Sequence, residues 1–126
     1  MSNPINIPLL DLSYLYELAG DDDQYIEEVI QLFIGSAPAK MIELDHKISY
    51  TEDFVLIREL AHFLKSSATI IKIRDMHDNL SRIETLAKAA TGRDEMLQLL
   101  KQLKANFSQA MPLLLAEEKR VQKKLR

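Results

Sequence analysis

Residues 54–73 read FVLIRELAHFLKSSATIIKI, and this stretch decides the fold that we expect for the 126-residue chain. Apolar residues recur in it at steps of three or four, which is the period of an amphipathic α-helix. We therefore predict a helix from Phe54 to about Ile73, capped by the segment Thr51–Asp53. The residues expected on its core face are Ile57, Leu60, Ala61, Leu64, Ala68 and Ile71.

The N-terminal side begins with Met1 to Pro8, which carries two of the four prolines and is predicted to be extended. We expect this extended segment to cover residues 1–10. Asp11 is then predicted to cap a short helix over Leu12–Ala19, and Gly20 is expected to end that helix.

A longer helix is predicted from about Asp22 to Ser49, because its apolar residues follow the same period. The acidic run Asp21–Asp23 lies where it complements the positive end of that helix. Gly35 and Pro38 are expected to kink or break the helix, since proline lacks the backbone N–H and clashes with the preceding turn.

On the C-terminal side, a helix is predicted from about Asp75 to Ala90, followed by a turn at Thr91–Gly92. The last helix is expected to begin near Asp94 and to bend at Pro112. Its end, Glu117–Arg126, is a charged helical tail that is expected to fray.

These helices and short turns predict an all-α fold, an antiparallel four-helix bundle with a short additional N-terminal helix. The length suits one domain over residues 1–126. With 47% hydrophobic and 28% charged residues, the composition is that of a globular protein.

The composition also argues against several classes of function. The chain has no Cys, which excludes disulfides, thiolate metal sites and cysteine nucleophiles. Its three glycines are too far apart for the nucleotide-binding motifs GxGxxG and GxxxxGKS/T. A net charge of -3 argues against a dedicated nucleic-acid binder. No apolar run approaches the roughly 20 residues that span a bilayer, and no signal peptide is evident, so we expect a cytoplasmic protein without a membrane partner.

Of the three histidines, His46 and His77 lie in charged stretches and are expected to be ordinary surface residues. His62 lies in the middle of the apolar stretch quoted above. Since successive residues rotate by about 100° around a helix, His62 must face solvent if Leu60 and Leu64 face the core. Its face is expected to carry Val55, Arg58, Glu59, Lys65, Ser66 and Thr69, with Arg58, Lys65 and Lys72 as a basic flank.

An exposed imidazole can act as a nucleophile, because its neutral form keeps a free nitrogen lone pair near neutral pH. Lys65 is one helical turn from His62, close enough for its ammonium to stabilise a phosphoryl group on the ring. The small side chains of Ser66 and Thr69 would let a partner surface approach. These residues form a candidate phosphoryl-acceptor site. The alternative is an ordinary surface histidine beside a basic flank.

The run Ala61–Ser67 resembles the signature of histidine-containing phosphotransfer (HPt) domains, which typically read A-H-x-L-K-G-S. The resemblance extends over about residues 9–115. Ser66 and Lys72 depart from the pattern, because glycine is common at both positions, and Ile73 stands where a small residue is common. The change at Lys72 leaves open whether the third helix runs longer or packs differently against the fourth. Downstream matches to the pattern are Ile71, Met76, Leu80, Ile83 and Glu84.

The resemblance implies a helical bundle that carries a phosphoryl group between receiver-domain aspartates in multistep phosphorelays. It implies that His62 is the phosphorylated residue, that Lys65 helps to neutralise the phosphoryl group, and that the chain is a phosphocarrier rather than an enzyme. The partners would be receiver domains of hybrid histidine kinases and response regulators, which supply magnesium. The chain itself would be a monomer with no cofactor or metal. Its docking surface would include Val55, Arg58, Glu59, Ser66, Thr69, Ile70 and Lys72.

Three alternatives stay open. A histidine kinase dimerisation domain also carries a phosphorylated histidine on a bundle, but it usually has an acidic residue where this chain has Phe63. An HPt-like adaptor bundle would bind signalling partners without phosphotransfer. The third alternative is a helical metal-binding protein, in which thiolate ligands are excluded because the chain has no Cys.

Overall fold

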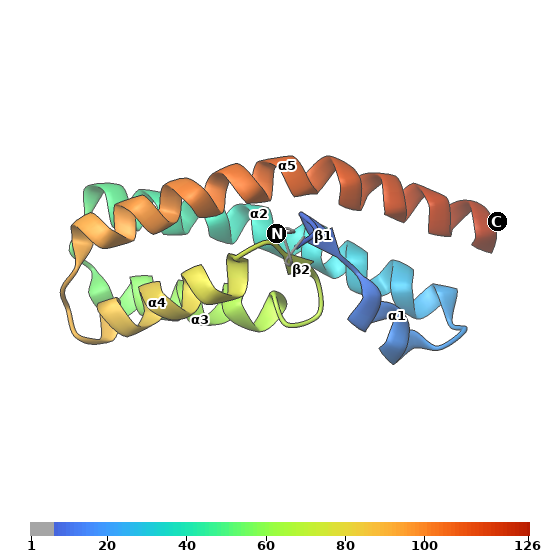
Figure 1. The fold of residues 1–126 in the computed structure, drawn as a ribbon, viewed down its shortest axis with the longest axis horizontal. Helices are drawn as coiled ribbons and strands as arrows, with labels where there is room; N and C mark the ends of the chain where they lie inside the picture. Colours follow the sequence, from blue (N-terminus) through green and yellow to red (C-terminus); the bar gives the residue numbers. More distant parts are fainter. Residues whose placement is uncertain (1–6) are drawn as a thin grey trace, which may run out of the picture.

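The computed structural model describes residues 7–126 and shows a mostly helical chain (Figure 1), so the predicted all-α class is confirmed. The extended segment predicted over residues 1–10 lies largely outside the described residues. The elements in chain order are β1 (Leu10–Asp11), α1 (Ser13–Ala19), α2 (Asp23–Tyr50), α3 (Phe54–Ser67), β2 (Lys72–Ile73), α4 (Met76–Lys88) and α5 (Arg93–Leu125).

The two long helices α2 and α5 lie along each other in opposite directions (Figure 1). Lys124 near the end of α5 pairs with Asp23 at the start of α2, at 3.2 Å. Arg93 at the start of α5 donates a hydrogen bond to the carbonyl of Ile48 near the end of α2. Helix α3 packs against α2 and α4, and α4 also packs against α5, so these four helices share one core.

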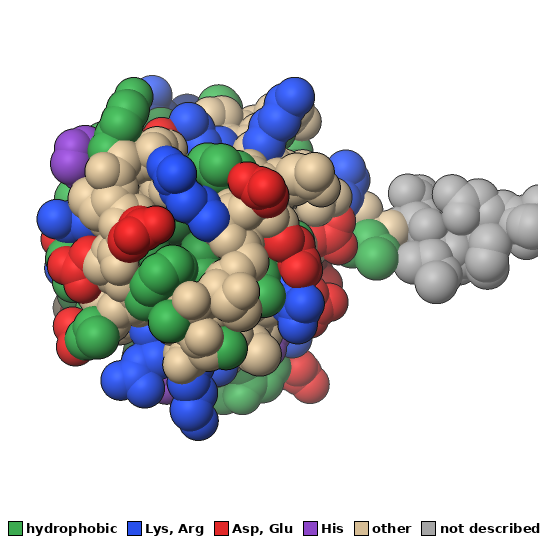
Figure 2. All heavy atoms as spheres, turned by 90° about the vertical axis from the view of Figure 1, so that its left-hand side faces the viewer, with side chains coloured by type: hydrophobic (Ala, Val, Ile, Leu, Met, Phe, Trp, Pro, Cys, Tyr) green, Lys and Arg blue, Asp and Glu red, His purple; other side chains and the backbone are tan. Residues whose placement is uncertain are grey.

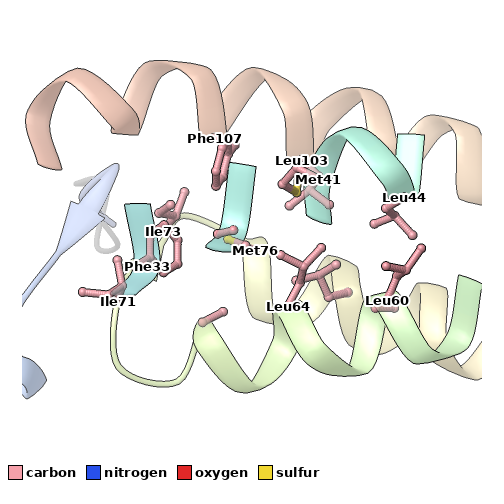
Figure 3. Close-up of a cluster of buried hydrophobic side chains, with 14 of the residues drawn as sticks. Phe33, Met41, Leu44, Leu60, Leu64, Ile71, Ile73, Met76, Leu103 and Phe107 are labelled. Carbon is pink, nitrogen blue, oxygen red and sulfur yellow. The ribbon is translucent and has the colours of Figure 1, made fainter. Parts of the chain in front are cut away.

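The core gathers apolar side chains from α2, α3, α4, α5 and β2, which point toward one another in Figure 3. Every residue predicted for the core face of residues 54–73 is buried. Burying one large aliphatic side chain contributes about 1.5–3 kcal/mol relative to leaving it exposed, so this shared core holds the helices together. The side chains labelled in Figure 3 are Phe33, Met41, Leu44, Leu60, Leu64, Ile71, Ile73, Met76, Leu103 and Phe107.

Helix α2 runs without interruption through Gly35 and Pro38, so of the predicted kink or break, the break is wrong. Ala37 and Met41, on either side of the proline, are buried on the core face. Tertiary packing along that whole face outweighs the one backbone hydrogen bond that Pro38 cannot make. Helix α5 likewise continues through Pro112 over 33 residues.

The helix starts follow the predictions in part. Asp53 accepts a backbone N–H in the first turn of α3, so the cap predicted in this segment is confirmed. Asp22 likewise accepts a backbone N–H, that of Tyr25, in the first turn of α2. Helix α1, however, begins one residue later than predicted, at Ser13, and Asp11 is not its N-cap. The reason is that Asp11 lies in β1, from where its carboxylate accepts both the N–H and the hydroxyl of Ser13.

Helix α3 ends at Ser67, so the prediction of a helix to about Ile73 is wrong. Beyond the turn that follows, Ile71 and Ile73 are both buried while Lys72 between them is exposed. That alternation is typical of an extended strand, because successive strand side chains point to opposite faces.

The short strand β2 pairs antiparallel with β1, with Leu10 opposite Ile73 and Asp11 opposite Lys72. Arg74 extends the contact, since its backbone N–H and its guanidinium donate to carbonyls in the chain before β1. The pairing joins segments that are far apart in the sequence, which is why the periodicity of residues 54–73 did not indicate it.

The charged tail of α5 is helical to Leu125, so the predicted fraying is wrong. Val121 in this tail is fully buried, and Arg126 pairs with the buried Glu27 of α2 at 3.2 Å. Packing against α2 therefore stabilises a segment whose composition alone favours a solvated end.

Tyr16 of α1 is tied to the same tail. Its hydroxyl donates to Glu117, and Arg120 contacts both groups. Burial and the neighbouring Glu117 carboxylate raise the pKa of Tyr16 to about 12. Hydrogen bonds from Arg120 and Tyr16 hold the pKa of Glu117 below its ordinary value. The cluster anchors α1 on α5.

The end of the molecule with the α2–α3 and α4–α5 connections carries acidic and basic side chains interspersed with apolar ones (Figure 2). Over residues 7–126, no helix is both long enough and apolar enough to cross a membrane. Within the same range, no three His, Asp or Glu side chains come together in a way that could hold a metal ion.

Candidate functional site

His62 lies in the middle of α3, and 65% of its side chain is exposed, as predicted. The sequence of α3 explains this exposure. Leu60, Ala61 and Leu64 are buried against the other helices, so the histidine between them is turned to solvent. Burial of the core-facing stripe of α3 thus leaves the imidazole on the solvent-facing side of the helix.

A carboxylate on α4 bridges the two polar groups of the site. Glu84 Oε2 lies 2.8 Å from Nδ1 of His62, and its Oε1 lies 2.6 Å from Nζ of Lys65. Close packing of α3 against α4 makes this contact possible. The result is a chain of three side chains, imidazole, carboxylate and ammonium, on the edge shared by two helices.

The pKa of Glu84 is held below its ordinary value, chiefly by the hydrogen bond from Lys65 and also by the one to His62, against the opposing effect of burial. An ionised carboxylate can only accept hydrogen bonds. We therefore assign the proton to Nδ1 of His62 in the neutral ring, which leaves the lone pair on Nε2. Within the described residues, Nε2 has no hydrogen-bond partner.

A groove of ≈ 620 Å³ surrounds the imidazole. Two serines, the ring of Phe63 and charged residues from α3 and α4 line it together with His62. Such a mixture of small, apolar and charged side chains is typical of a surface that contacts another protein. The lining residues are Arg58, Glu59, His62, Phe63, Ser66, Ser67, Glu84 and Lys88.

Two large apolar side chains of α3 are also exposed on this side. Val55 is 64% exposed and Phe63 is 41% exposed. The ammonium of Lys40, on α2, lies 5.5 Å from the centre of the Phe63 ring, within cation–π range. Exposed apolar side chains beside a polar site are a common feature of protein docking surfaces.

Three residues predicted for the docking surface do not lie on α3. Thr69 and Ile70 follow its end, and the Thr69 hydroxyl donates back to the carbonyl of Ser66. Lys72 lies in β2, and its ammonium stands 5.1 Å above the ring of Tyr14 on α1. The predicted basic flank is wrong at Lys72, because α3 stops before that residue.

Glu84 and Lys88 of α4 and Lys40 of α2 were not predicted as site residues. Glu84 follows the core residue Ile83, so it lies at the rim of α4 that faces a neighbouring helix. Its charge is opposite to that of Lys65, and this was the one signal in the sequence that could have suggested an ion pair between the two residues. What was missing is the register between α3 and α4, which no local pattern specifies.

The other two histidines are exposed, as predicted. The ring of His46 lies 5.3 Å from that of Tyr50 in the same helix. His77 lies 3.8 Å from its neighbour Asp78. Neither is bridged to an ammonium by a shared carboxylate, which distinguishes His62 from both within the described residues.

Comparison with known proteins defines the class. The sequence model of one family, the Hpt domain, matches residues 28–111, which is more than half of the chain. The chain therefore belongs to the Hpt domain family. Members of this family are phosphocarriers of two-component signalling that interact with receiver domains. Neither the comparison with curated proteins nor that with solved structures returned a match.

Proposed function

We propose that this chain carries a phosphoryl group on His62 between the aspartates of receiver domains in a multistep phosphorelay. The observation that supports this most is the exposed imidazole whose Nδ1 lies 2.8 Å from an ionised carboxylate. That contact orients the ring and leaves Nε2 as the nucleophilic nitrogen.

In the proposed step, the lone pair of Nε2 attacks the phosphorus of a receiver's acyl phosphate, in line with the P–O bond that breaks. The electrons of that bond stay on the receiver's aspartate. Nδ1 keeps its proton, so the ring becomes a cation beside the carboxylate of Glu84. The receiver supplies magnesium, and this chain supplies the nucleophile and its orientation.

Lys65 is proposed to help neutralise the transferred phosphoryl group. Its side chain is 27% exposed, and its ammonium pairs with Glu84 when His62 carries no phosphoryl group. A lysine ammonium is a compact charge on a long stem, which suits it to move from one anion to another.

The proposed docking surface is centred on the exposed face of α3, at Val55, Arg58, Glu59 and Ser66. Thr69 and Ile70 continue it beyond the helix end. Lys72 is left out, because its ammonium faces Tyr14. Arg58 and Lys88 in the groove would attract the acidic site of a receiver and so mainly increase the rate of association.

We further propose that residues 1–126 form a single domain, with α2 to α5 as an antiparallel four-helix bundle and α1 as the additional helix. The four helices share one core, which supports this arrangement. The chain would act in the cytoplasm as a monomer, without autokinase activity.

The direct experiment is transfer from a radiolabelled, phosphorylated receiver domain of a hybrid kinase from the same organism. We expect label on the parent chain and none on His62→Gln, and we expect the label to be acid-labile and alkali-stable, as a phosphohistidine is. Incubation with ATP and magnesium alone should leave the chain unlabelled. If no receiver of the organism transfers label, the adaptor function is favoured instead.

A further inference from the structure

We propose that Glu84 controls how long the phosphoryl group stays on His62, and that it keeps this lifetime short. The inference rests on the proposed function, since it concerns the phosphorylated form of the same histidine. It is carried by the shared carboxylate, which lies 2.8 Å from the imidazole Nδ1 and 2.6 Å from the Lys65 ammonium. Glu84 is a positioning residue here, because it acts through the ring and the lysine.

The first part of the argument concerns the proton on Nδ1. When Nε2 forms the N–P bond, Nδ1 is not involved, and its proton stays between the ring and Glu84. When the phosphoryl group leaves, the N–P bond breaks and its electrons return to Nε2. The departing group is then a neutral imidazole, with the same proton on Nδ1. Neither transfer requires a proton to be exchanged with water.

The retained proton makes the phosphohistidine labile. A ring that had lost it would have to leave as an imidazolate anion, which is a far poorer leaving group than neutral imidazole. The negative charge of Glu84 stabilises the protonated, cationic ring. Of the other charged groups in the groove, Arg58 and Lys88 oppose this effect and Glu59 adds to it, but only Glu84 is in hydrogen-bond contact with the ring among the described residues.

The second part of the argument concerns Lys65. An ammonium paired with the phosphoryl group would stabilise the phosphorylated form. Glu84 competes for that ammonium, and its geometry is favourable at 2.6 Å. Both effects of Glu84 therefore act in the same direction, toward early loss of the phosphoryl group.

The test uses potassium phosphoramidate, a small donor that phosphorylates histidine without a partner protein. Parent, Glu84→Gln, Glu17→Gln and His62→Gln chains are labelled and the donor is removed. The loss at neutral pH of the phosphohistidine signal that His62→Gln lacks is then followed by ³¹P NMR. Glutamine can still accept a hydrogen bond from Nδ1 but carries no charge. We expect the phosphohistidine of Glu84→Gln to live about fivefold longer, as suits loss of one charged hydrogen bond at a partly exposed site.

Glu17→Gln is the matched control, because it removes the same charge from an exposed position of α1, outside the groove. Its phosphohistidine is expected to live as long as that of the parent. Circular dichroism and thermal unfolding of each variant check that the fold is kept. Equal lifetimes in the parent and Glu84→Gln would overturn the proposal for Glu84 and leave the phosphocarrier function standing. If phosphoramidate labels the parent no more than His62→Gln, both proposals fail.

A second measurement does not depend on phosphorylation. The ¹⁵N chemical shifts of the unphosphorylated His62 ring report which nitrogen carries the proton. We expect the proton on Nδ1 in the parent and a mixture of both tautomers in Glu84→Ala, in which the acceptor is lost. A parent ring with its proton on Nε2 would overturn the proposal, since Glu84 would then hold no proton in place.

Discussion

Lys65 and Glu84 lie on different helices, yet the lysine Nζ and the carboxylate Oε1 are only 2.6 Å apart. The same carboxylate reaches the imidazole of His62 through its other oxygen. The Lys65 ammonium is therefore connected to the His62 ring through the Glu84 carboxylate. This relationship makes the behaviour of the site depend on α4 as much as on α3.

Lys65→Ala should slow phosphoryl transfer to His62 by about tenfold, because the developing phosphoryl charge loses a cation that can pair with it. The fold should be unchanged, since the side chain is partly exposed and lies outside the core. Single-turnover transfer from a phosphorylated receiver measures the rate. Lys101→Ala, which removes an exposed lysine from α5, is the control. Unchanged kinetics in Lys65→Ala would remove this role from the lysine.

Ser66→Trp should abolish or strongly weaken receiver binding, because an indole at this exposed position fills the groove beside His62. Isothermal titration with a receiver domain would detect the loss, for which we expect at least about tenfold in Kd. Ser108→Trp places the same bulk on an exposed position of α5 and should bind like the parent. Normal binding by Ser66→Trp would move the docking surface to another face.

Gly92→Ala and Gly35→Ala should change stability in opposite directions. Gly92 has φ of 77°, and an added Cβ would lie 2.6 Å from a methyl carbon of Leu86, so its replacement should cost about 1–2 kcal/mol. Gly35 lies inside α2, and a Cβ added there would meet no atom outside the local helix backbone within 4 Å, so alanine should add about 0.5–1 kcal/mol. Urea unfolding of both variants tests the pair, and equal shifts of the two midpoints would contradict it.

Stability should fall in acid partly through Glu117, whose pKa is held below its ordinary value by Arg120 and Tyr16. A carboxyl with a lowered pKa in the folded state contributes stability that is fully present above its ordinary pKa. That contribution is lost as the pH falls through the lower, folded-state pKa. Glu117→Gln should therefore be less stable than the parent at neutral pH, and the difference should shrink in acid. Glu52→Gln, at an exposed position, is expected to show no such convergence.

Much of the fold could be predicted because helix periodicity is a local property. The buried residues of α3, Ile57, Leu60, Ala61 and Leu64, follow a spacing that is visible in the sequence. The exposure of His62 followed from the same spacing, since a side chain on the side of a helix opposite its core face points to solvent. The cap at Asp53 was equally local, because a carboxylate satisfies N–H groups within its own first turn.

The errors all lie where contacts between distant segments outweigh local preference. α2 continues through Pro38 because its whole core face is packed, and the tail of α5 stays helical because Val121 is buried and Arg126 reaches Glu27. α3 ends early because its continuation pairs with β1. Composition and periodicity carry no information on such partners.

The candidate site also has a part that the sequence could indicate and a part that depends on contacts between distant segments. The chemistry of His62 and Lys65 could be inferred from their types and from a separation of one helical turn. Only the tertiary structure shows that Glu84 contacts both residues, which led us to assign the proton to Nδ1 of His62. It also shows that the Lys72 ammonium faces Tyr14, which is why we leave Lys72 out of the proposed docking surface. The physical reason is that a helix determines which of its residues share a face, whereas the register between two helices is set by how their side chains interdigitate in the core.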